Sequence, residues 1–562
     1  DAPQPTLSRT PRLTGGSAMK PALGSWGSLL VLLALSNSQT LPPCDVGLYT
    51  LAVSSTAEAL ELTEALLCSG GQFEVVWLGD VLITSTIAIW YGTSLKITGS
   101  PFGGQGVVDG GGEIRLFEMA VGATLELNKL SLVGGYSDSF GGAIEVNGYS
   151  FDSTSFDTTS LDIVDCSFVG NTAENGGAIF SESGTVTISG NSTFANNAAS
   201  GSGGAIEVYY GTVSTEGRTT FTNNSAPSSG GAIHGLFAEA LTFRGESVFV
   251  DNFANFGGAI NTVSSSFDAD TIVTIEDSST FANNVANISG GAIALDSADA
   301  TIGGVSTFVN NSAGLWSGGA IYYLEGVLTI EGETYLGNNS AGSYGGAICG
   351  EPFGVTNEFL GNLTIHGLVD LTGNRAGLDG GALYLGETKQ CTIDPINGSF
   401  TGNNAEGNGG AIGVANGATL SIGGPISFMS NTAQSNGGAI AVFDAAIIAE
   451  EGPTFTSNIA ITGAGGGIYC SASIASFDGS VFTANEATWG GGLALFSTGS
   501  AWSKADPVES GPVNTTNCVF HRNNATDGGA IYSAAGYDII QDCWFEANFA
   551  GAKMMMDVFD RF

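Results

Sequence analysis

The sequence is poor in positive charge, in histidine and in proline. Of its 562 residues, 14 are Lys or Arg and 3 are His, against 53 Asp and Glu, so the formal net charge is −39. A chain of this charge repels phosphate over most of its surface, which excludes a nucleic-acid-binding protein. Only 14 residues are Pro and 43% are hydrophobic, which excludes a disordered chain and a collagen-like one.

Long hydrophobic runs are also scarce, and no stretch reaches the ~18 consecutive apolar residues of a membrane-spanning helix. The run Trp26–Leu35 follows Met19 and Lys20 and precedes small residues, which is the pattern of a secretory signal peptide. A buried helix is the alternative. We therefore expect residues 1–38 to hold an upstream segment plus a signal peptide (Met19–Ser38), and the protein to be extracellular or on the cell surface.

Glycine is abundant, with 86 residues, and many of these glycines belong to a repeat. The tetrapeptide Gly-Gly-Ala-Ile or a close variant occurs fourteen times, most often at intervals of 27 or 28 residues. The copies begin at Gly141, Gly176, Gly203, Gly230, Gly257, Gly290, Gly318, Gly345, Gly380, Gly409, Gly437, Gly465, Gly490 and Gly528. This regularity indicates one repeat array and not several separate domains.

Two further motifs complete each repeat. Phe-x-x-Asn precedes the paired glycines by 8 to 10 residues, with Tyr335 and Leu371 in place of Phe in two copies. Between the two motifs lies a pair of apolar residues separated by one residue, such as Val186 and Ile188. The alternation of these short segments predicts three strands in each repeat. Because stacking buries faces that a single repeat leaves exposed, we predict an all-β, right-handed, three-sided parallel β-helix of about 14 coils over residues 101–550.

Each motif has a structural role in such a coil. We expect the Phe and Ile side chains to form internal ladders, the paired glycines to form corners, and the Asn to form a turn or a stacked amide ladder. Thr56–Leu67 has helical spacing and predicts an N-terminal helical cap, within a cap and first irregular coils over residues 39–100. Residues 551–562 are expected to be a ragged or truncated end.

The repeated Gly-Gly-Ala-Ile with Phe-x-x-Asn resembles the passenger region of the polymorphic outer-membrane proteins of chlamydiae, over about residues 130–548. Similar repeats occur in right-handed β-helix proteins of the pectin-lyase-like superfamily. The resemblance implies an adhesin-like surface rod whose partner is a protein or glycan of a host or neighbouring cell. The chlamydial proteins carry a C-terminal β-barrel and this sequence ends inside a repeat, so membrane attachment, if any, is expected through a missing C-terminal region.

The pectin-lyase-like superfamily also contains polysaccharide lyases and glycoside hydrolases, so a polysaccharide-active enzyme is the alternative. Such hydrolases need two or more carboxylates in one groove. The three histidines are scattered, and Arg115, Arg218 and Arg244 do not lie beside acidic clusters in the sequence. We therefore expect a non-catalytic protein with no cofactor and no metal site. A groove that holds three carboxylates with a basic residue would favour the enzyme.

The residue after each repeat Ile is expected to point toward solvent. Aromatic residues at this position form a possible binding stripe for protein or carbohydrate: Phe180, Tyr322, Tyr384, Tyr469 and Tyr532. The favoured alternative is that they are ordinary strand-forming residues on a sheet surface. Inserted loops at the long intervals, 147–161, 351–361 and 497–514, are the other candidate binding elements.

Eight cysteines fit an oxidising compartment. Cys44 and Cys68 flank the expected helix and are candidates for a disulfide. Cys518 and Cys543 lie in neighbouring coils, each two residues before the repeat Phe, and one coil spacing is within the Cα range of a disulfide. Buried free thiols are the alternative.

Overall fold

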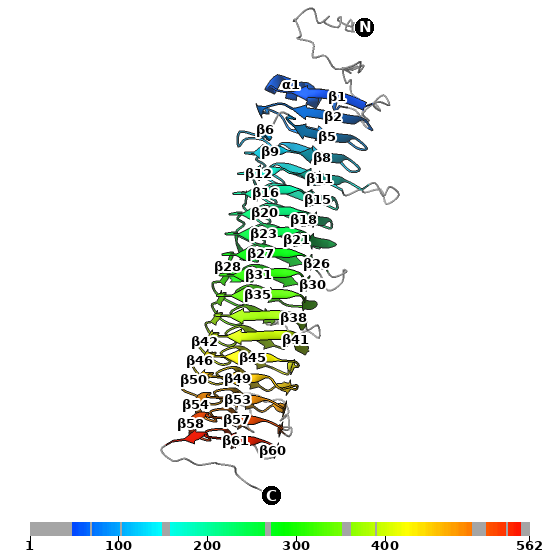
Figure 1. Cartoon of the computed structure of the whole chain (residues 1–562). Coiled ribbons are helices and arrows are strands. Elements are labelled where there is room, and N and C mark those ends of the chain that lie inside the picture. The colour runs from blue at the N-terminus through cyan, green and yellow to red at the C-terminus, as the bar shows by residue number, and fades with distance from the viewer. Residues whose placement is uncertain are drawn as a thin grey trace, which may run out of the picture.

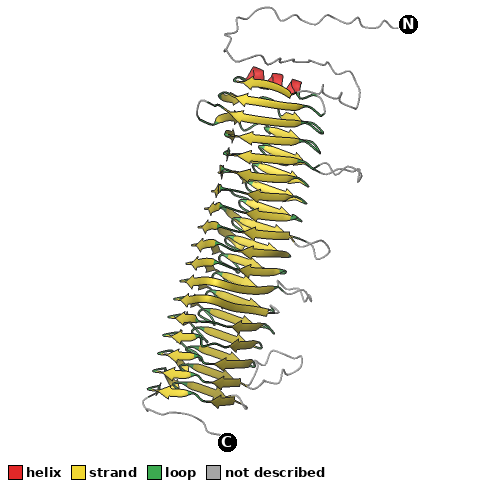
Figure 2. Cartoon of the chain, turned by 45° about the vertical axis from the view of Figure 1, so that its right-hand side comes forward, coloured by secondary structure: helices red, strands yellow, loops and turns green. Residues whose placement is uncertain are grey.

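The computed structural model describes residues 48–67, 70–101, 104–148, 158–264, 271–350, 361–387, 390–496, 513–534 and 538–551. These residues form one elongated parallel β-solenoid in which successive coils stack from one end of the chain to the other (Figures 1 and 2). Each strand pairs in parallel with the matching strands of the coils before and after it. The predicted all-β parallel solenoid is therefore confirmed.

One coil shows the order of its strands. β14 (Ile179–Glu182) follows the paired glycines, β15 (Thr185–Ser189) holds the apolar pair, β16 (Asn191–Ala195) holds the repeat Phe, and β17 (Ala198–Ala199) is a short addition after the repeat Asn. Equivalent strands stack into four ladders, which we call the Gly-Gly, apolar-pair, Phe and short-strand ladders. The three predicted strands are thus present, with a short fourth that the sequence did not indicate.

Three of the ladders extend along almost the whole described chain, and the short-strand ladder begins at Thr172. The Gly-Gly ladder runs from β4 (Ile87–Ile89) to β59 (Ile531–Ala534), and the apolar-pair ladder runs from β1 (Leu48–Val53) to β60 (Asp538–Gln541). The Phe ladder runs from β3 (Asp80–Leu82) to β61 (Trp544–Glu546). The short-strand ladder runs from β13 (Thr172–Ala173) to β62 (Phe549–Ala550).

The Gly-Gly ladder has 16 strands, so the predicted number of 14 coils was too low. The two additional coils contain β4 and β7 (Phe117–Met119), which precede the first Gly-Gly-Ala-Ile. Phe117 pairs with Ile144, so these coils occupy the same position without the glycine motif. These two coils were not predicted because their strands are formed by buried apolar side chains without the paired glycines.

Two long strands continue through a corner at which the other coils have two separate strands. β38 (Asn362–Thr372) and β41 (Gln390–Thr401) each contribute to the apolar-pair ladder with their first half and to the Phe ladder with their second. The two ladders are consequently one continuous 33-stranded sheet.

The predicted aromatic ladder is present in the core. The rings of Phe281 and Phe308 stack with centroids 4.7 Å apart and planes 1° apart, and both are fully buried. Such contacts add about 0.5–1.5 kcal/mol each to the free energy gained from burial. Tyr335 was wrongly predicted to replace Phe: Leu336 pairs with Phe308 and is buried, whereas Tyr335 is exposed. Leu371 is in the ladder as expected.

A ladder of buried asparagines lies at the next corner. Both the backbone N–H and Nδ2 of Asn197 donate to Oδ1 of Asn224, at 3.0 Å each, and Nδ2 also donates to the carbonyl of Phe168 at 3.0 Å. The pattern repeats through fourteen residues: Asn171, Asn197, Asn224, Asn252, Asn284, Asn311, Asn339, Asn374, Asn403, Asn431, Asn458, Asn485, Asn523 and Asn548. The side chains thus satisfy turn groups that would otherwise be buried without partners.

The two glycines of the motif are needed for different reasons. Gly318 has φ of +69°, a conformation that most side chains disfavour. Gly319 has ordinary φ, but a Cβ there would lie 2.1 Å from the carbonyl oxygen of Gly346 in the next coil. The first glycine makes the turn, and the second lets adjacent coils approach.

A single helix, α1 (Thr56–Ala65), is present in the described part of the chain, where the sequence predicts one. The Ser55 hydroxyl accepts a hydrogen bond from the Glu58 backbone N–H and thereby caps the first turn. Ala59 and Leu62 are buried and join the solenoid core. The helix lies at the N-terminal end of the stack (Figure 2). Its role as a cap against edge pairing stays a prediction.

Candidate functional site

The residues after each repeat Ile do not form an exposed stripe. Phe180, Tyr322 and Tyr384 are only 6, 7 and 6% exposed, and Tyr469 and Tyr532 are half-buried. The expectation of solvent exposure was therefore wrong for the first three. They lie on the outward side of the Gly-Gly ladder, but that side is covered.

Neighbouring aromatic residues provide the cover. Phe140, which precedes the paired glycines of its coil, stacks on Phe180 with centroids 4.3 Å apart, and Tyr344 stacks in the same way on Tyr384 at 4.4 Å. Tyr322 and Tyr384 also belong to a second buried cluster, apart from the main core, with Ala294 and Cys349. Nearer the C-terminal end the contacts are looser, and Tyr469 lies between Phe443 and Phe496 at 5.2 and 5.4 Å.

A buried pair of ionisable side chains lies on the same side of the solenoid. His234 pairs with Glu207 of the preceding coil, with 3.3 Å between Nδ1 and Oε1, and both residues are 5% exposed. Oε2 of Glu207 is buried with no hydrogen-bond partner among the described residues.

Arg115 is the most enclosed cation of this region. Its Nη1 lies 2.5 Å from Oε2 of Glu145 and 3.6 Å from Oε2 of Glu118. Burial raises the pKa of Glu145, although the Arg115 charge acts in the opposite direction. Nε of Arg115 donates to the carbonyls of Phe140 and Gly141 at 3.2 and 3.1 Å.

The hydrogen bonds of Arg115 explain its position. In later coils, each corner carbonyl accepts a hydrogen bond from a backbone N–H of the preceding coil. For example, the Gly141 N–H donates to the Asn175 carbonyl at 2.9 Å. In the coil before Gly141, Ile114 and Arg115 occupy the positions of the paired glycines, and the Arg115 guanidinium supplies donors to the corner carbonyls. Arg115 thus closes the first Gly-Gly corner, a structural role.

Two other arginines also pair with carboxylates of the next coil. Arg218 contacts Glu246 at 3.5 Å and Arg244 contacts Glu276 at 2.9 Å. Because the partners are about one repeat apart in sequence, neither pair forms a local cluster that sequence inspection detects. Both pairs are exposed and contribute little stability.

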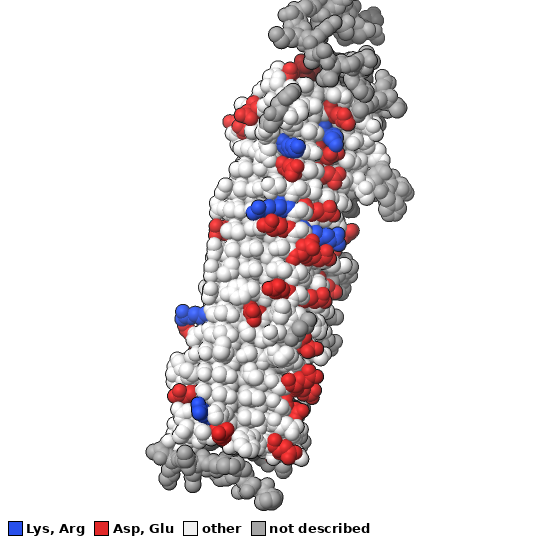
Figure 3. Space-filling view, viewed as in Figure 1, with Lys and Arg blue, Asp and Glu red and all other residues white. Residues whose placement is uncertain are grey.

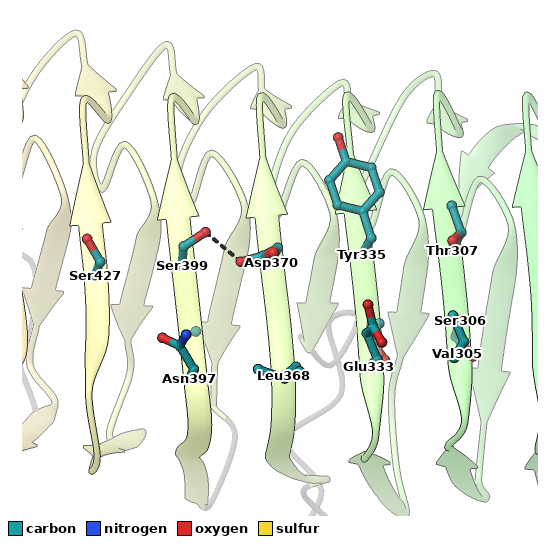
Figure 4. Close-up of a pocket in the computed structure, with 12 residues that line it drawn as sticks. Val305, Ser306, Thr307, Glu333, Tyr335, Leu368, Asp370, Asn397, Ser399 and Ser427 are labelled. Atoms are coloured by element: carbon teal, nitrogen blue, oxygen red, sulfur yellow. Dashed lines mark hydrogen bonds between the residues drawn. The ribbon is translucent and has the colours of Figure 1, made fainter.

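A shallow cavity of about 380 Å³ lies on the outward side of the Phe ladder. Figure 4 shows its residues on five adjacent strands, β31 (Val305–Val309), β35 (Glu333–Gly337), β38, β41 and β45 (Ile426–Met429). Asp370 accepts a hydrogen bond of 2.7 Å from the Ser399 hydroxyl. Glu333 and the exposed ring of Tyr335 line the same cavity.

The chemistry available in this cavity is limited. Its lining holds two carboxylates, Glu333 and Asp370, and no Lys, Arg or His. The combination of three carboxylates and a base that would favour a polysaccharide-active enzyme is thus not assembled there. Within the described ranges, no three His, Cys, Asp or Glu side chains are grouped to hold a metal ion.

Of the cysteine candidates, Cys44 and Cys68 lie outside the described residues. Cys518 and Cys543 face each other across adjacent coils and are unbridged in the structure. The Cys518 thiol is a hydrogen-bond partner of Cys543, and this bond lowers the pKa of Cys543 to about 7. By contrast, burial raises the pKa of Cys166, which fills the same inward slot in another coil, to about 11.

The three predicted insertions lie largely outside the described residues, but the strands that flank them are described. They separate β10 (Ile144–Asn147) from β11 (Ser160–Val164), β37 (Ile348–Gly350) from β38, and β55 (Leu493–Phe496) from β56 (Val513–Thr516). In each case a Gly-Gly strand precedes and an apolar-pair strand follows. All three insertions therefore begin and end at the same corner of the coil.

Comparison with protein families gives matches to three single coils of the solenoid. The model of the Chlamydia polymorphic membrane protein (Chlamydia_PMP) repeat matches residues 165–182, 218–236 and 425–442. Each match runs from the Phe strand through the buried Asn and the paired glycines into the Gly-Gly strand. Three segments of the chain are thus similar to the Chlamydia polymorphic membrane protein repeat. The resemblance proposed from the motifs is confirmed in these three places.

No curated protein and no solved structure matches the chain. In the described part, no helix has the length and hydrophobicity needed to cross a membrane. The polymorphic membrane protein repeat and the parallel solenoid together favour a surface protein with a β-helical rod.

Proposed function

We propose that the protein is a secreted or cell-surface rod that acts by binding, without catalysis, to proteins or glycans of a host or neighbouring cell. The observation that carries this proposal is that the fold uses every residue of the repeated motif. The Phe side chains form the core, the asparagines satisfy the corner and the glycines let the coils stack. The repeat thus builds a scaffold, and chemical variety is left to outward residues and insertions.

The position of the insertions supports the same function. Stacking of 16 coils at ~4.8 Å gives a rod of roughly 75 Å. Connections at one corner of such a rod lie along one edge, so several of them can contact one partner at once. Weak contacts that act together give high avidity without a deep pocket.

Glycan-array and cell-surface binding by the full chain tests the proposal. In a matched variant, residues 497–512 are replaced by Ser-Gly, the connection that joins β14 to β15. We expect binding to fall while the circular dichroism spectrum is kept. The same replacement of residues 351–360 shows whether each insertion contributes separately. Absence of binding to every glycan and to every cell surface tested would contradict the proposal.

The alternative, a polysaccharide-active enzyme, is favoured by one observation, the carboxylates Glu333 and Asp370 in one cavity. Incubation with pectin-like and alginate-like polymers tests it directly. Hydrolysis or unsaturated product that disappears in the double variant Glu333→Gln with Asp370→Asn would replace the binding proposal by the enzymatic one.

A further inference from the structure

A row of hydroxyl groups runs along the outward side of the apolar-pair ladder. In nine consecutive coils the residue between the two apolar side chains is Thr or Ser, and these residues are paired directly in the strand register. The row consists of Thr187, Ser214, Thr242, Thr274, Thr301, Thr329, Thr364, Thr392 and Ser421. Every member is partly exposed.

The same strands provide an internal comparison. The residue two positions earlier also points outward, and it changes freely along the rod. In the same nine coils it is Thr185, Thr212, Ala240, Ile272, Asp299, Val327, Asn362, Gln390 and Thr419. General strand preference would allow Val or Ile at both positions. The restriction to hydroxyls in one row alone indicates a requirement beyond strand formation.

The hydroxyls are not needed by the fold. Thr187 interacts with Asp162, and the other eight have no hydrogen bond to another protein group in the described part of the chain. They are therefore available to a partner. Figure 3 shows charged side chains gathered along one edge of this side of the rod and others scattered over the rest of it, with uncharged surface between them.

A second, interrupted row lies beside the first on the same 33-stranded sheet. On the Phe ladder the outward position before the repeat Phe holds Thr193, Thr220, Thr280 and Thr307, with Val248 between them. The sheet thus presents hydroxyl and methyl groups both along the rod and across it. Along the rod, these groups are separated by the spacing between coils.

The coil spacing is regular. Stacked rings at Phe249, Phe281 and Phe308 have centroids 4.7 Å apart at both steps. Nine hydroxyls therefore extend over roughly 38 Å at ~4.8 Å per strand. A partner that meets many of them at once needs hydrogen-bonding groups with nearly the same repeat over a long distance, which a protein loop or a short oligosaccharide does not have. A crystalline surface has it.

We propose that the hydroxyl row from Thr187 to Ser421 binds the surface of ice. Water oxygens in hexagonal ice both donate and accept hydrogen bonds, and their repeat along one lattice axis is only slightly shorter than the spacing of β-strands. The row contains no aromatic ring on which a sugar can pack, which disfavours crystalline polysaccharide. The threonine methyls release ordered water when they contact the ice surface, and the rigid register keeps the hydroxyls in step.

This proposal is independent of the proposed function, since it uses the sheet surface and not the insertion-bearing corner. The test measures thermal hysteresis, inhibition of ice recrystallisation and adsorption of the fluorescently labelled full chain to a single ice crystal. We expect all three for the unmodified chain. The double variant Thr301→Tyr with Thr329→Tyr, which places bulk in the middle of the row, is expected to lose them.

The matched control is Gln434→Tyr with Thr462→Tyr, two exposed residues of adjacent coils away from the row, which should keep the full effect. The smaller change Thr301→Val with Thr329→Val removes only hydroxyls and guards against loss through misfolding; it is expected to reduce the hysteresis. Equal effects of row and control variants, absence of hysteresis in the unmodified chain, or adsorption to crystalline cellulose or chitin in place of ice would overturn the proposal.

Discussion

Asn284 and Asn311 are joined twice: the backbone N–H and the side-chain Nδ2 of Asn284 both donate to Oδ1 of Asn311, at 3.0 Å each. The Asn311 amide in turn donates to the Phe281 carbonyl at 2.9 Å. One side chain thus satisfies three polar groups of the preceding coil. The same relationship at each repeat makes the buried asparagines the polar counterpart of the aromatic ladder.

Asn311→Ala should destabilise the coils around it. The change leaves the Asn284 backbone N–H and a side-chain N–H buried without an acceptor, at about 1–3 kcal/mol each. Hydrogen exchange of amides in the neighbouring coils measures the loss, because a long repeat array does not unfold as a single unit. The exposed Asn287→Ala is the control and should change exchange little; equal effects of the two variants would contradict the role given to the ladder.

Gly319→Ala should be strongly destabilising although its φ is ordinary. The new Cβ meets the Gly346 carbonyl oxygen at 2.1 Å, and neither backbone can move without breaking the stack. We expect a loss at or above the upper end of the ~1–3 kcal/mol usual for overpacking, measured by thermal unfolding and local hydrogen exchange. Gly79→Ala is the control, since no atom lies within 4 Å of its added Cβ. A tolerated Gly319→Ala would show that the coils can separate at this corner.

Cys543 should be the most reactive of the described thiols near neutral pH. The Cys518 hydrogen bond lowers its pKa to about 7, so its alkylation by iodoacetamide should rise with pH and level off above a midpoint of about 7. Cys166, with its pKa raised to about 11 by burial, should stay unmodified over the same range. Mass spectrometry of peptides gives both rates, and a midpoint above about 9 for Cys543 would be inconsistent with this assignment.

Oxidised glutathione should convert the Cys518 and Cys543 thiols to a disulfide. The two thiols lose two protons and two electrons, and the oxidant is reduced to two molecules of glutathione. The expected product is two hydrogens lighter and no longer alkylated at either residue. Cys543→Ser removes the partner and serves as the control. Persistent alkylation of Cys543 after oxidation would show that the pair does not close.

Phe180→Ala separates a packing role from a binding role for the outward aromatic residues. Because Phe180 is 6% exposed under Phe140, we expect the variant to lose stability, by up to the ~3–5 kcal/mol of a buried Phe, and to keep any ligand binding. The half-buried Tyr532→Ala should have a smaller effect on stability. Thermal unfolding and glycan-array binding are measured together, and loss of binding with unchanged stability would restore the stripe as a ligand site.

The coil could be read from the sequence because its motifs carry the physical constraints. Paired glycines are required by a positive φ and by coil contact, and the Phe and Asn by burial, so each leaves a recognisable residue at a fixed interval. The first two coils, with Ile87 and Phe117, were missed because they form the same strand without glycines. The short strands were missed because most of them bury a single small residue, such as Ala199.

The candidate surface features were less predictable, because they depend on residues one coil apart. Burial of Phe180 requires Phe140, and the Arg115 interactions require Glu145, yet neither partner is adjacent in sequence. The error at Tyr335 has a related origin: Tyr and Leu stand side by side, and only the pairing with Phe308 decides which one faces inward.

The asparagine ladder also gives the rod a direction. In every step from Asn171 to Asn548 the amide of the earlier coil donates to that of the later one, and no step is reversed. Aligned amide dipoles reinforce one another in a buried, low-dielectric environment. Their positive ends all point toward the C-terminal end, so the solenoid has an electrical polarity along its axis. Two such rods that lie side by side are therefore expected to prefer opposite orientations.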